Sequence, residues 1–417
     1  MTSEIKQRIE QIRRGEVPEG YVKTALGLAP ANWKRYTFGD IYTERKEPGD
    51  ENLPLLMVSI HSGVSDGEVD AAELPKQVKR IEDKSQYKKA VSGDLVFNMM
   101  RAWQGAIGTV RTTGMVSPAY IVAEPNDKVY PLFMDYYSRT PQMINQIDRQ
   151  SYGVTDFRKR LYWDSFAPIG CTLPPIEEQQ KIAAILTTQD KVIELKEKRL
   201  AEKQRQKKYF MQQLLTGKKR LPGFSGEWKK TKLKNILYER KTYSPKGLEY
   251  PHVTLSAEGI FPKSERYDRD HLVRDEDKEY KITHKGDICY NPANLKFGAI
   301  CENTFGDAIF SPIYVTFEVE ENICKEYIAN YLMRWDFINA VRKYEEGTVY
   351  ERMAVKPEDF LKFEIFLPQI EEQAAIAEVL STADREIELL QQDIEQEKQK
   401  KKALMQLLLT GIVRVKT

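Results

Sequence analysis

One stretch of the sequence occurs twice in the chain. Residues 173–221 align without a gap with residues 367–415, a shift of 194 positions, and about half of the paired residues are identical. The first copy begins LPPIEEQQKIAAIL and ends KKYFMQQLLTG, while the second begins LPQIEEQAAIAEVL and ends KKALMQLLLTG. Chance does not produce such a match, so the chain contains two versions of one structural unit.

The residues before each copy also repeat, more weakly and at nearly the same shift. Gly93-Asp94 matches Gly286-Asp287, whereas most polar positions differ. At 417 residues the chain is longer than one hydrophobic core normally grows. We therefore expect two globular domains of mixed α/β (α+β) structure in tandem. Their expected limits are residues 31–172 and 223–366, after an N-terminal helix and lead-in at residues 1–30.

Each repeated segment is predicted to be a long helix, the first within residues 173–222 and the second within residues 367–417. Gly217 and Gly411 are suited to end these helices, which would extend about 60 Å. Apolar residues at steps of four and seven form one stripe on each helix: Ile182, Leu186, Ile193, Leu200 and Leu214, then Ile376, Leu380, Ile387, Ile394 and Leu408. We expect the helices to pack as an antiparallel coiled coil, related by an internal two-fold pseudo-repeat.

The ends of the two helical copies match closely, whereas their middles differ. A purely structural coiled coil explains the apolar stripe but does not require matched ends such as IEEQ and LLTG. We infer that the ends present one kind of surface to two copies of the same partner. The predicted partner-binding residues are Glu177, Glu178, Gln179, Ile182, Leu214, Leu215, Glu371, Glu372, Gln373, Ile376, Leu408 and Leu409.

The charges of the chain nearly balance. Lysine and arginine number 64 and aspartate and glutamate 62, which gives a net charge of +2, so any DNA site must be a local patch. No apolar run is long enough to span a membrane and residues 1–10 lack the apolar core of a signal peptide, so we expect a cytoplasmic protein. The cysteines and histidines are scattered and match no metal-binding motif, so no metal site is expected.

The repeated motifs resemble those of a known family. LPPIEEQ and LPQIEEQ each precede a long segment that ends in LLTG, and the first copy continues as KKRLPGFSGEWKKTKL. The segment RGEVPEGYVKTALGLAPANW, before the first predicted domain, fits the same pattern. Together these motifs are similar to those of the specificity (S) subunits of Type I restriction-modification systems, and the resemblance covers essentially the whole chain.

The resemblance implies a division of labour between several proteins. Each of two target-recognition domains would read one half of a bipartite double-stranded DNA site, and the helices would set the spacing and dock two methyltransferase subunits. Restriction and translocase subunits would join the complex, and AdoMet, ATP and Mg²⁺ would bind to the partner subunits. This chain would hold no cofactor and perform no catalysis.

The residues themselves also argue against chemistry in this chain. An adenine methyltransferase needs a glycine-rich AdoMet-binding turn and an Asn/Asp-Pro-Pro-aromatic motif, and the nearest match, Asn291-Pro292-Ala293-Asn294, lacks the second proline and the aromatic residue. No GxxxxGK[ST] motif for ATP is present either. We therefore predict no catalytic residue.

Sequence reading requires Arg, Lys, Asn or Gln side chains that reach base edges, with further basic groups on phosphates. Two pairs of matched segments offer such side chains, at 98–104 and 291–296 and at 151–160 and 346–352. The candidate DNA-binding residues there are Asn98, Arg101, Gln104, Tyr152, Thr155, Arg158, Lys159, Arg160, Asn291, Asn294, Lys296, Thr348, Tyr350 and Arg352. The matched pairs Arg45-Lys46 and Arg240-Lys241 are candidate phosphate contacts.

Several of these assignments have structural alternatives. Asn98 and Asn291 equally suit the capping of a turn. The four basic residues Arg45, Lys46, Arg240 and Lys241 equally suit a solvated surface. For the whole chain, the alternative is a coiled-coil scaffold for protein interactions without DNA recognition, whose complex would not show the salt dependence of phosphate contacts.

Overall fold

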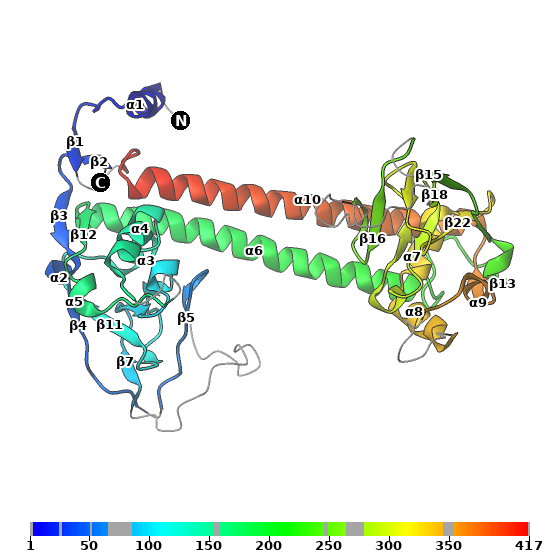
Figure 1. Ribbon diagram of the computed structural model, residues 1–417, viewed down its shortest axis with the longest axis horizontal. Helices are drawn as coiled ribbons and strands as arrows, with labels where there is room; N and C mark the ends of the chain where they lie inside the picture. Colours follow the sequence, from blue (N-terminus) through cyan, green and yellow to red (C-terminus); the bar gives the residue numbers. More distant parts are fainter. Residues whose placement is uncertain are drawn as a thin grey trace. The chain divides into compact units, whose positions relative to one another are not determined.

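The computed structural model describes residues 3–24, 27–50, 52–65, 86–153, 158–245, 249–263, 279–344 and 354–415 (Figure 1). The chain divides into two compact units. Unit 1 comprises Met1–Lys196 with Asp393–Thr417, and unit 2 comprises Glu197–Gln392. The division falls inside both long helices, so each unit combines one globular part with a portion of each helix. The predicted domain limits therefore stay predictions.

Unit 1 contains a four-stranded antiparallel sheet in the order β4-β11-β8-β9. Its strands are β4 (Tyr42–Glu44), β11 (Tyr120–Pro125), β8 (Leu95–Asn98) and β9 (Ile107–Thr109). Around it lie the helices α2 (Phe38–Ile41), α3 (Pro131–Tyr137), α4 (Pro141–Gln150) and α5 (Trp163–Phe166). Three further pairs of strands complete the unit: β3 (Lys34–Thr37) with β12 (Gly170–Leu173), β7 (Lys88–Ala90) with β10 (Gly114–Val116), and β5 (Val58–Ser59) with β6 (Gly63–Val64).

Unit 2 contains a four-stranded antiparallel sheet of corresponding order, β14-β22-β19-β20. Its strands are β14 (Leu237–Glu239), β22 (Val315–Val319), β19 (Ile288–Tyr290) and β20 (Ile300–Glu302). Beside it lie the helices α7 (Lys325–Leu332), α8 (Trp335–Val341) and α9 (Pro357–Leu361). The remaining strands form a three-stranded sheet of β15 (Tyr243–Pro245), β18 (Glu279–Thr283) and β21 (Ala308–Phe310), and two pairs, β13 (Lys229–Lys232) with β23 (Glu364–Leu367) and β16 (Val253–Ser256) with β17 (Gly259–Pro262). The weak repeat in the sequence thus corresponds to two sheets with one strand order, and both units mix helix and strand as expected.

The predicted long helices are confirmed. Helix α6 spans Ile176–Leu214, 39 residues, and α10 spans Ile370–Leu409, 40 residues, so each is about 60 Å long. Their apolar residues enter the cores of the units: Ile182 and Leu186 are fully buried in unit 1 together with Leu408, and Ile376 and Leu380 are buried in unit 2 together with Leu214. Each core is therefore closed by the start of one helix and the end of the other.

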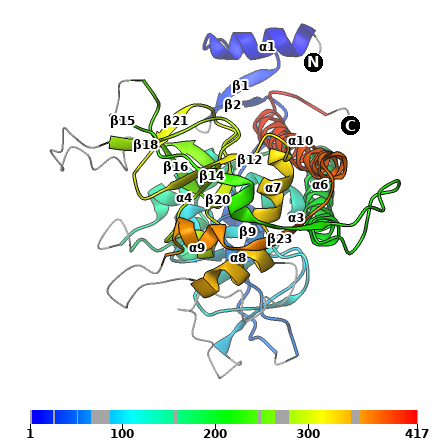
Figure 2. The same ribbon diagram turned by 90° about the vertical axis from the view of Figure 1, so that its right-hand side faces the viewer.

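Within each unit the two helices lie side by side (Figure 2) and run antiparallel (Figure 1). They also exchange polar contacts. In unit 1, the Lys196 ammonium donates to Asp393 Oδ1 at 2.8 Å and to Glu397 Oε1 at 3.0 Å. In unit 2, Lys203 pairs with Glu386 and Lys207 with Asp384, both at 2.5 Å. Exposed ion pairs of this kind contribute little stability, so they mainly select the register while the apolar residues hold the helices.

The first turn of each long helix carries a buried carboxylate held by an arginine and a tryptophan. In unit 2, Arg220 donates to both oxygens of Glu372 at 2.5 and 2.6 Å, and the Trp228 indole N–H donates at 3.2 Å. Glu372 is only 2% exposed. A buried charge requires such pairing, and the two-pronged guanidinium fixes the direction of the carboxylate. We call this arrangement the carboxylate clamp.

Unit 1 contains the same carboxylate clamp, built from distant parts of the chain. Arg414 donates to both oxygens of Glu178 at 2.6 and 2.7 Å, and the Trp33 indole N–H donates to Glu178 at 3.3 Å. Glu178 is completely buried. In unit 2 the arginine and tryptophan lie eight residues apart on one segment, whereas here they come from residues before β3 and after α10.

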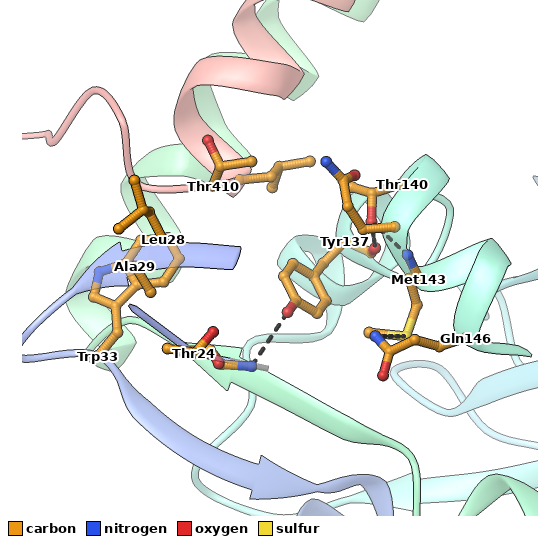
Figure 3. A pocket seen from close by; sticks show the side chains of 12 residues that line it. Thr24, Leu28, Ala29, Trp33, Tyr137, Thr140, Met143, Gln146 and Thr410 are labelled. Carbon is orange, nitrogen blue, oxygen red and sulfur yellow. Dashed lines mark hydrogen bonds between the residues drawn. The ribbon is translucent and has the colours of Figure 1, made fainter. Parts of the chain in front are cut away.

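The lead-in segment of unit 1 packs against the end of α10. It comprises α1 (Ser3–Arg13), β1 (Tyr21–Thr24) and β2 (Gly27–Pro30). The Tyr21 hydroxyl donates to the Gly411 carbonyl at 2.6 Å, and Arg8 donates to the Ile412 carbonyl at 3.1 Å. A small cavity of about 60 Å³ remains between Leu28, Trp33, Thr410 and neighbouring side chains (Figure 3). The Tyr137 hydroxyl beside this cavity accepts from the Thr172 N–H at 3.2 Å.

Removing the arginine of one carboxylate clamp should destabilise only the unit that contains it. Arg414→Met leaves the Glu178 carboxylate without its ionic partner and should lower the melting temperature of unit 1 by ~4–8 °C, or ~2 kcal/mol. Arg220→Met should do the same to unit 2. Differential scanning calorimetry measures both, with Arg205→Met, an exposed position of α6, as the control. An equal shift of both transitions in either variant would contradict two independent clamps.

Candidate DNA interface

A matched turn lies at the same sheet edge in both units. In unit 1 it follows β8 and contains the 3₁₀ helix η2 (Ala102–Gln104), and in unit 2 it follows β19 and contains η6 (Leu295–Phe297). Each turn ends at a glycine with positive φ, Gly105 at +104° and Gly298 at +82°, a conformation that other residues rarely adopt. We call residues 98–105 and 291–298 the edge turns.

The asparagines that open the edge turns hold the backbone. Asn98 Oδ1 accepts the Met100 N–H at 2.9 Å, and Asn291 Oδ1 accepts the N–H groups of Ala293 and Asn294 at 3.1 and 3.3 Å. Asn291 is also only 4% exposed. The capping alternative thus accounts for both asparagines, and DNA contact by Asn98 or Asn291 stays a prediction.

The other four predicted residues of the edge turns are wholly or partly exposed to solvent. Arg101 and Gln104 are exposed in unit 1, as is Asn294 in unit 2, and Lys296 is half-buried. These four side chains include cationic and amide groups on a backbone that the asparagine and glycine fix. They therefore keep the geometry that base contacts require, and their contact with DNA stays a prediction.

The second predicted segment of unit 1 lies against its edge turn. The Lys159 ammonium sits 5.6 Å from the centre of the Trp103 ring and also pairs with Asp148 at 2.8 Å, while the Leu161 N–H donates to the Met99 carbonyl. Two segments that are 50 residues apart in sequence thus form one surface. Around them the exposed candidates are Tyr152, Arg158 and Arg160. Thr155, Thr348, Tyr350 and Arg352 lie outside the described residues.

The arginines predicted to hold phosphates each pair with a buried aspartate of their own unit. Arg45 donates to both oxygens of Asp94 at 2.8 and 3.2 Å, and Arg240 donates to both oxygens of Asp287 at 2.9 and 3.0 Å. The aspartates are almost fully buried. Burial raises the pKa of the Asp94 carboxyl, an effect that the hydrogen bonds from Arg45 oppose. Arg45 and Arg240 therefore hold buried aspartates of their own units, and phosphate contact by these two arginines stays a prediction.

Lys46 and Lys241, next to these arginines, are largely exposed. The Lys46 ammonium lies 3.1 Å from the Glu44 carboxylate, and the Lys241 ammonium lies 3.6 Å from the Glu239 carboxylate. Both lysines are free to leave such exposed ion pairs for a phosphate at little cost. They stay candidate phosphate contacts.

Exposed aromatic and apolar side chains beside the edge turns were missed by the sequence analysis. Phe297 is 63% exposed and Trp335 54% in unit 2, and Met100 and Tyr162 are partly exposed in unit 1. The sequence repeat could have revealed Phe297. The shift of 193 residues that aligns Asn98 with Asn291 also aligns Gln104 with Phe297. If this position belonged to a core shared by both units, both copies would carry an apolar residue. A phenylalanine in one copy and a glutamine in the other therefore indicate an exposed position.

Comparison with known proteins agrees with this architecture. The family described as Type I restriction modification DNA specificity domain matches residues 72–204 and 226–399, most of the chain and both units. The chain belongs to this family. Among the described residues, no group of three or more His, Cys, Asp or Glu side chains is placed to hold a metal, and no helix is long and apolar enough to cross a membrane.

Relatives of the specificity family match over nearly the whole chain. The type I restriction enzyme MjaX specificity subunit of Methanocaldococcus jannaschii is 24% identical to this chain, and the alignment covers 96% of this chain and 98% of the relative. The MjaVIII specificity subunit of the same organism is also 24% identical, over 80% of this chain and 83% of the relative. The crystal structure of the HsdS subunit from Thermoanaerobacter tengcongensis superimposes with a TM-score of 0.50 at 17% identity, over 92% of this chain and 98% of that one. The crystal structure of the Type-I restriction-modification system S subunit from M. genitalium superimposes with a TM-score of 0.54 at 10% sequence identity, over 93% of this chain and 97% of that one.

As a specificity subunit the chain recognises DNA for a type I restriction-modification system. Its helix ends nevertheless differ from our expectation, because ten of the twelve predicted partner-binding residues are buried within their own unit: Glu178, Gln179, Ile182, Leu214, Leu215, Glu372, Gln373, Ile376, Leu408 and Leu409. Gln179 and Gln373, for example, accept from the backbone N–H groups of Tyr130 and Cys324. The matched ends therefore anchor each helix to its own unit, and partner contact by these ten residues stays a prediction. Glu177 and Glu371 are exposed.

A double-mutant cycle tests the structural role of Arg240 in the specificity subunit. Arg240→Gln leaves Asp287 charged and buried, and should lower the melting temperature of unit 2 by ~4–8 °C. Adding Asp287→Asn should restore part of this loss because no charge remains unpaired. Lys241→Gln, the exposed neighbour, should change the melting temperature by at most ~2 °C. An Arg240→Gln protein that melts like the wild type would restore this arginine as a surface group.

Proposed function

We propose that unit 1 and unit 2 each read one half of a bipartite DNA site, and that α6 and α10 set the spacing between the half-sites. The observation that carries this proposal is the pair of edge turns, which share a backbone but expose different side chains. A shared backbone with different side chains suits two different half-sites. Rigid helices of fixed length suit a fixed spacing, as dimer geometry does in other DNA-binding proteins.

Base contacts are assigned to the exposed edge-turn residues. Arg101 and Lys296 suit guanine, while Gln104 and Asn294 suit adenine. The basic residues Arg158 and Arg160 next to the edge turn of unit 1 suit phosphates. Because the net charge of the chain is only +2, this local concentration of charge is what a DNA site on this protein requires.

Catalysis is assigned to other subunits of a cytoplasmic complex. Two methyltransferase subunits would bind AdoMet and modify adenine, and restriction and translocase subunits would use ATP and Mg²⁺. The contribution of this chain is to place those enzymes on a chosen sequence. Its own residues need only bind and orient DNA, which agrees with the absence of the methyltransferase and ATPase motifs from the sequence.

Docking of the two methyltransferase subunits is assigned to the outer faces of the long helices, since the matched helix ends are buried. Leu195 on α6 is 64% exposed and Leu389 on α10 is 58% exposed. The shift of 194 residues pairs these two leucines. A large apolar side chain that is exposed at the same place in both copies fits two copies of one partner. The exposed Glu177 and Glu371 lie on the same helices.

Co-expression with the methyltransferase encoded beside this chain tests the proposal. In a host without other DNA methylation, modified bases are mapped by long-read sequencing. We expect one bipartite motif, methylated only when both chains are present. A soluble, assembled complex that methylates no motif would favour the scaffold alternative.

Substitution of the exposed leucines tests the docking faces. Leu195→Ser or Leu389→Ser should each weaken one of two partner sites by ~10–100-fold, because a leucine buried at an interface contributes ~1.5–3 kcal/mol. Native mass spectrometry should then show one methyltransferase subunit per chain in place of two, and none in the double variant. Glu202→Ser, an exposed polar position of α6, is the control. Unchanged stoichiometry in the double variant would place docking elsewhere.

A further inference from the structure

Phe297 occupies an unusual position for a phenylalanine. It is the last residue of η6, and its side chain is 63% exposed although the rest of unit 2 offers a core. Its backbone is fixed on both sides, since the Phe297 N–H donates to the Asn294 carbonyl at 2.9 Å and Gly298 follows with a φ of +82°. The ring is therefore presented to solvent by a rigid turn.

Two neighbours shape the surroundings of Phe297. Trp335, at the start of α8, is 54% exposed and lies against the same glycine, since a Cβ atom on Gly298 would stand 3.7 Å from its ring. The Lys296 ammonium lies 5.2 Å from the centre of the Phe297 ring. The acidic neighbour Asp336 is ion-paired with Arg334. This patch is apolar and cationic, which suits a polyanion with apolar groups better than an apolar protein surface.

The matched turn of unit 1 carries a different side chain at this position. Gln104 is the last residue of η2, is exposed, and precedes Gly105 as Phe297 precedes Gly298. Glutamine recognises adenine through two hydrogen bonds, whereas phenylalanine in the major groove contacts the C5-methyl group of thymine. One backbone position thus offers polar recognition in one unit and apolar recognition in the other.

We propose that this position reads a base in each unit, and that Phe297 recognises a thymine methyl group in the half-site of unit 2. The proposal rests on the DNA-reading function proposed above and assigns one of its contacts. Trp335, which lies against the neighbouring Gly298, extends the apolar surface beside the turn, and Lys296 draws the adjacent phosphate or guanine toward it.

Thymine-to-deoxyuridine replacement tests the contact directly, because it removes only the methyl group. Once the methylated motif is known, duplexes are made in which each thymine of both half-sites is replaced in turn. The assembled complex should lose about 3–10-fold in affinity at one position of a single half-site, the loss expected for one methyl group. With Phe297→Ala, the complex should bind the thymine and deoxyuridine duplexes equally.

A matched variant and a stability measurement complete the experiment. Phe305→Ala, which removes another exposed phenylalanine of unit 2, should keep the deoxyuridine effect, and all variants should melt at the wild-type temperature. The proposal is overturned by a motif without thymine in the half-site of unit 2, by equal binding of all deoxyuridine duplexes, or by a Phe297→Ala variant that loses subunit assembly while keeping its motif. Absence of any sequence-specific binding by the wild-type complex would instead reject the proposed function itself.

Discussion

The carboxylate clamp is the interaction on which the arrangement of each unit depends. A glutamate in the first turn of a long helix is buried, and a buried carboxylate is tolerated only when it is paired and hydrogen-bonded. Glu372 meets this requirement with Arg220 and Trp228, which both follow α6. Glu178 meets it with Arg414, which follows α10, and with Trp33, which precedes β3. The clamp therefore joins the start of one helix, the segment after the other and the residue that precedes β3 or β13, so it fixes the direction of the helices within the unit.

The fold was largely predictable from the sequence because the repeat reports it twice. The long helices, their glycine ends at Gly217 and Gly411 and the presence of two related domains of mixed helix and strand follow from periodicity and matched residues, whereas the strand order comes from the structure alone. The role of the IEEQ motif was not predictable. A residue matched between two copies is equally consistent with an internal anchor and with an external contact, and only the position of Arg220 and Arg414 beside the glutamates shows that the anchor is internal.

The candidate interface was predicted in part. Arg101, Gln104 and Asn294 are exposed as a reading surface requires, because polar side chains next to a turn glycine rarely have a core to enter. The pairing of Arg45 and Arg240 with Asp94 and Asp287 was not foreseen, since these aspartates lie more than 40 residues away in sequence. Phe297 was overlooked for the opposite reason: a phenylalanine is normally counted toward the core, and nothing local marks it as exposed.

The two-part construction of unit 1 has a consequence for synthesis. Unit 2 is one continuous stretch, so it is complete once Gln392 has left the ribosome, whereas unit 1 waits for Arg414 to close on Glu178. At ~5–20 residues per second, the first 196 residues spend roughly 10–40 s without the helix that covers their core. The part of the chain made first is therefore the part that matures last, because its core lacks Leu408 and Leu409 until α10 has been made.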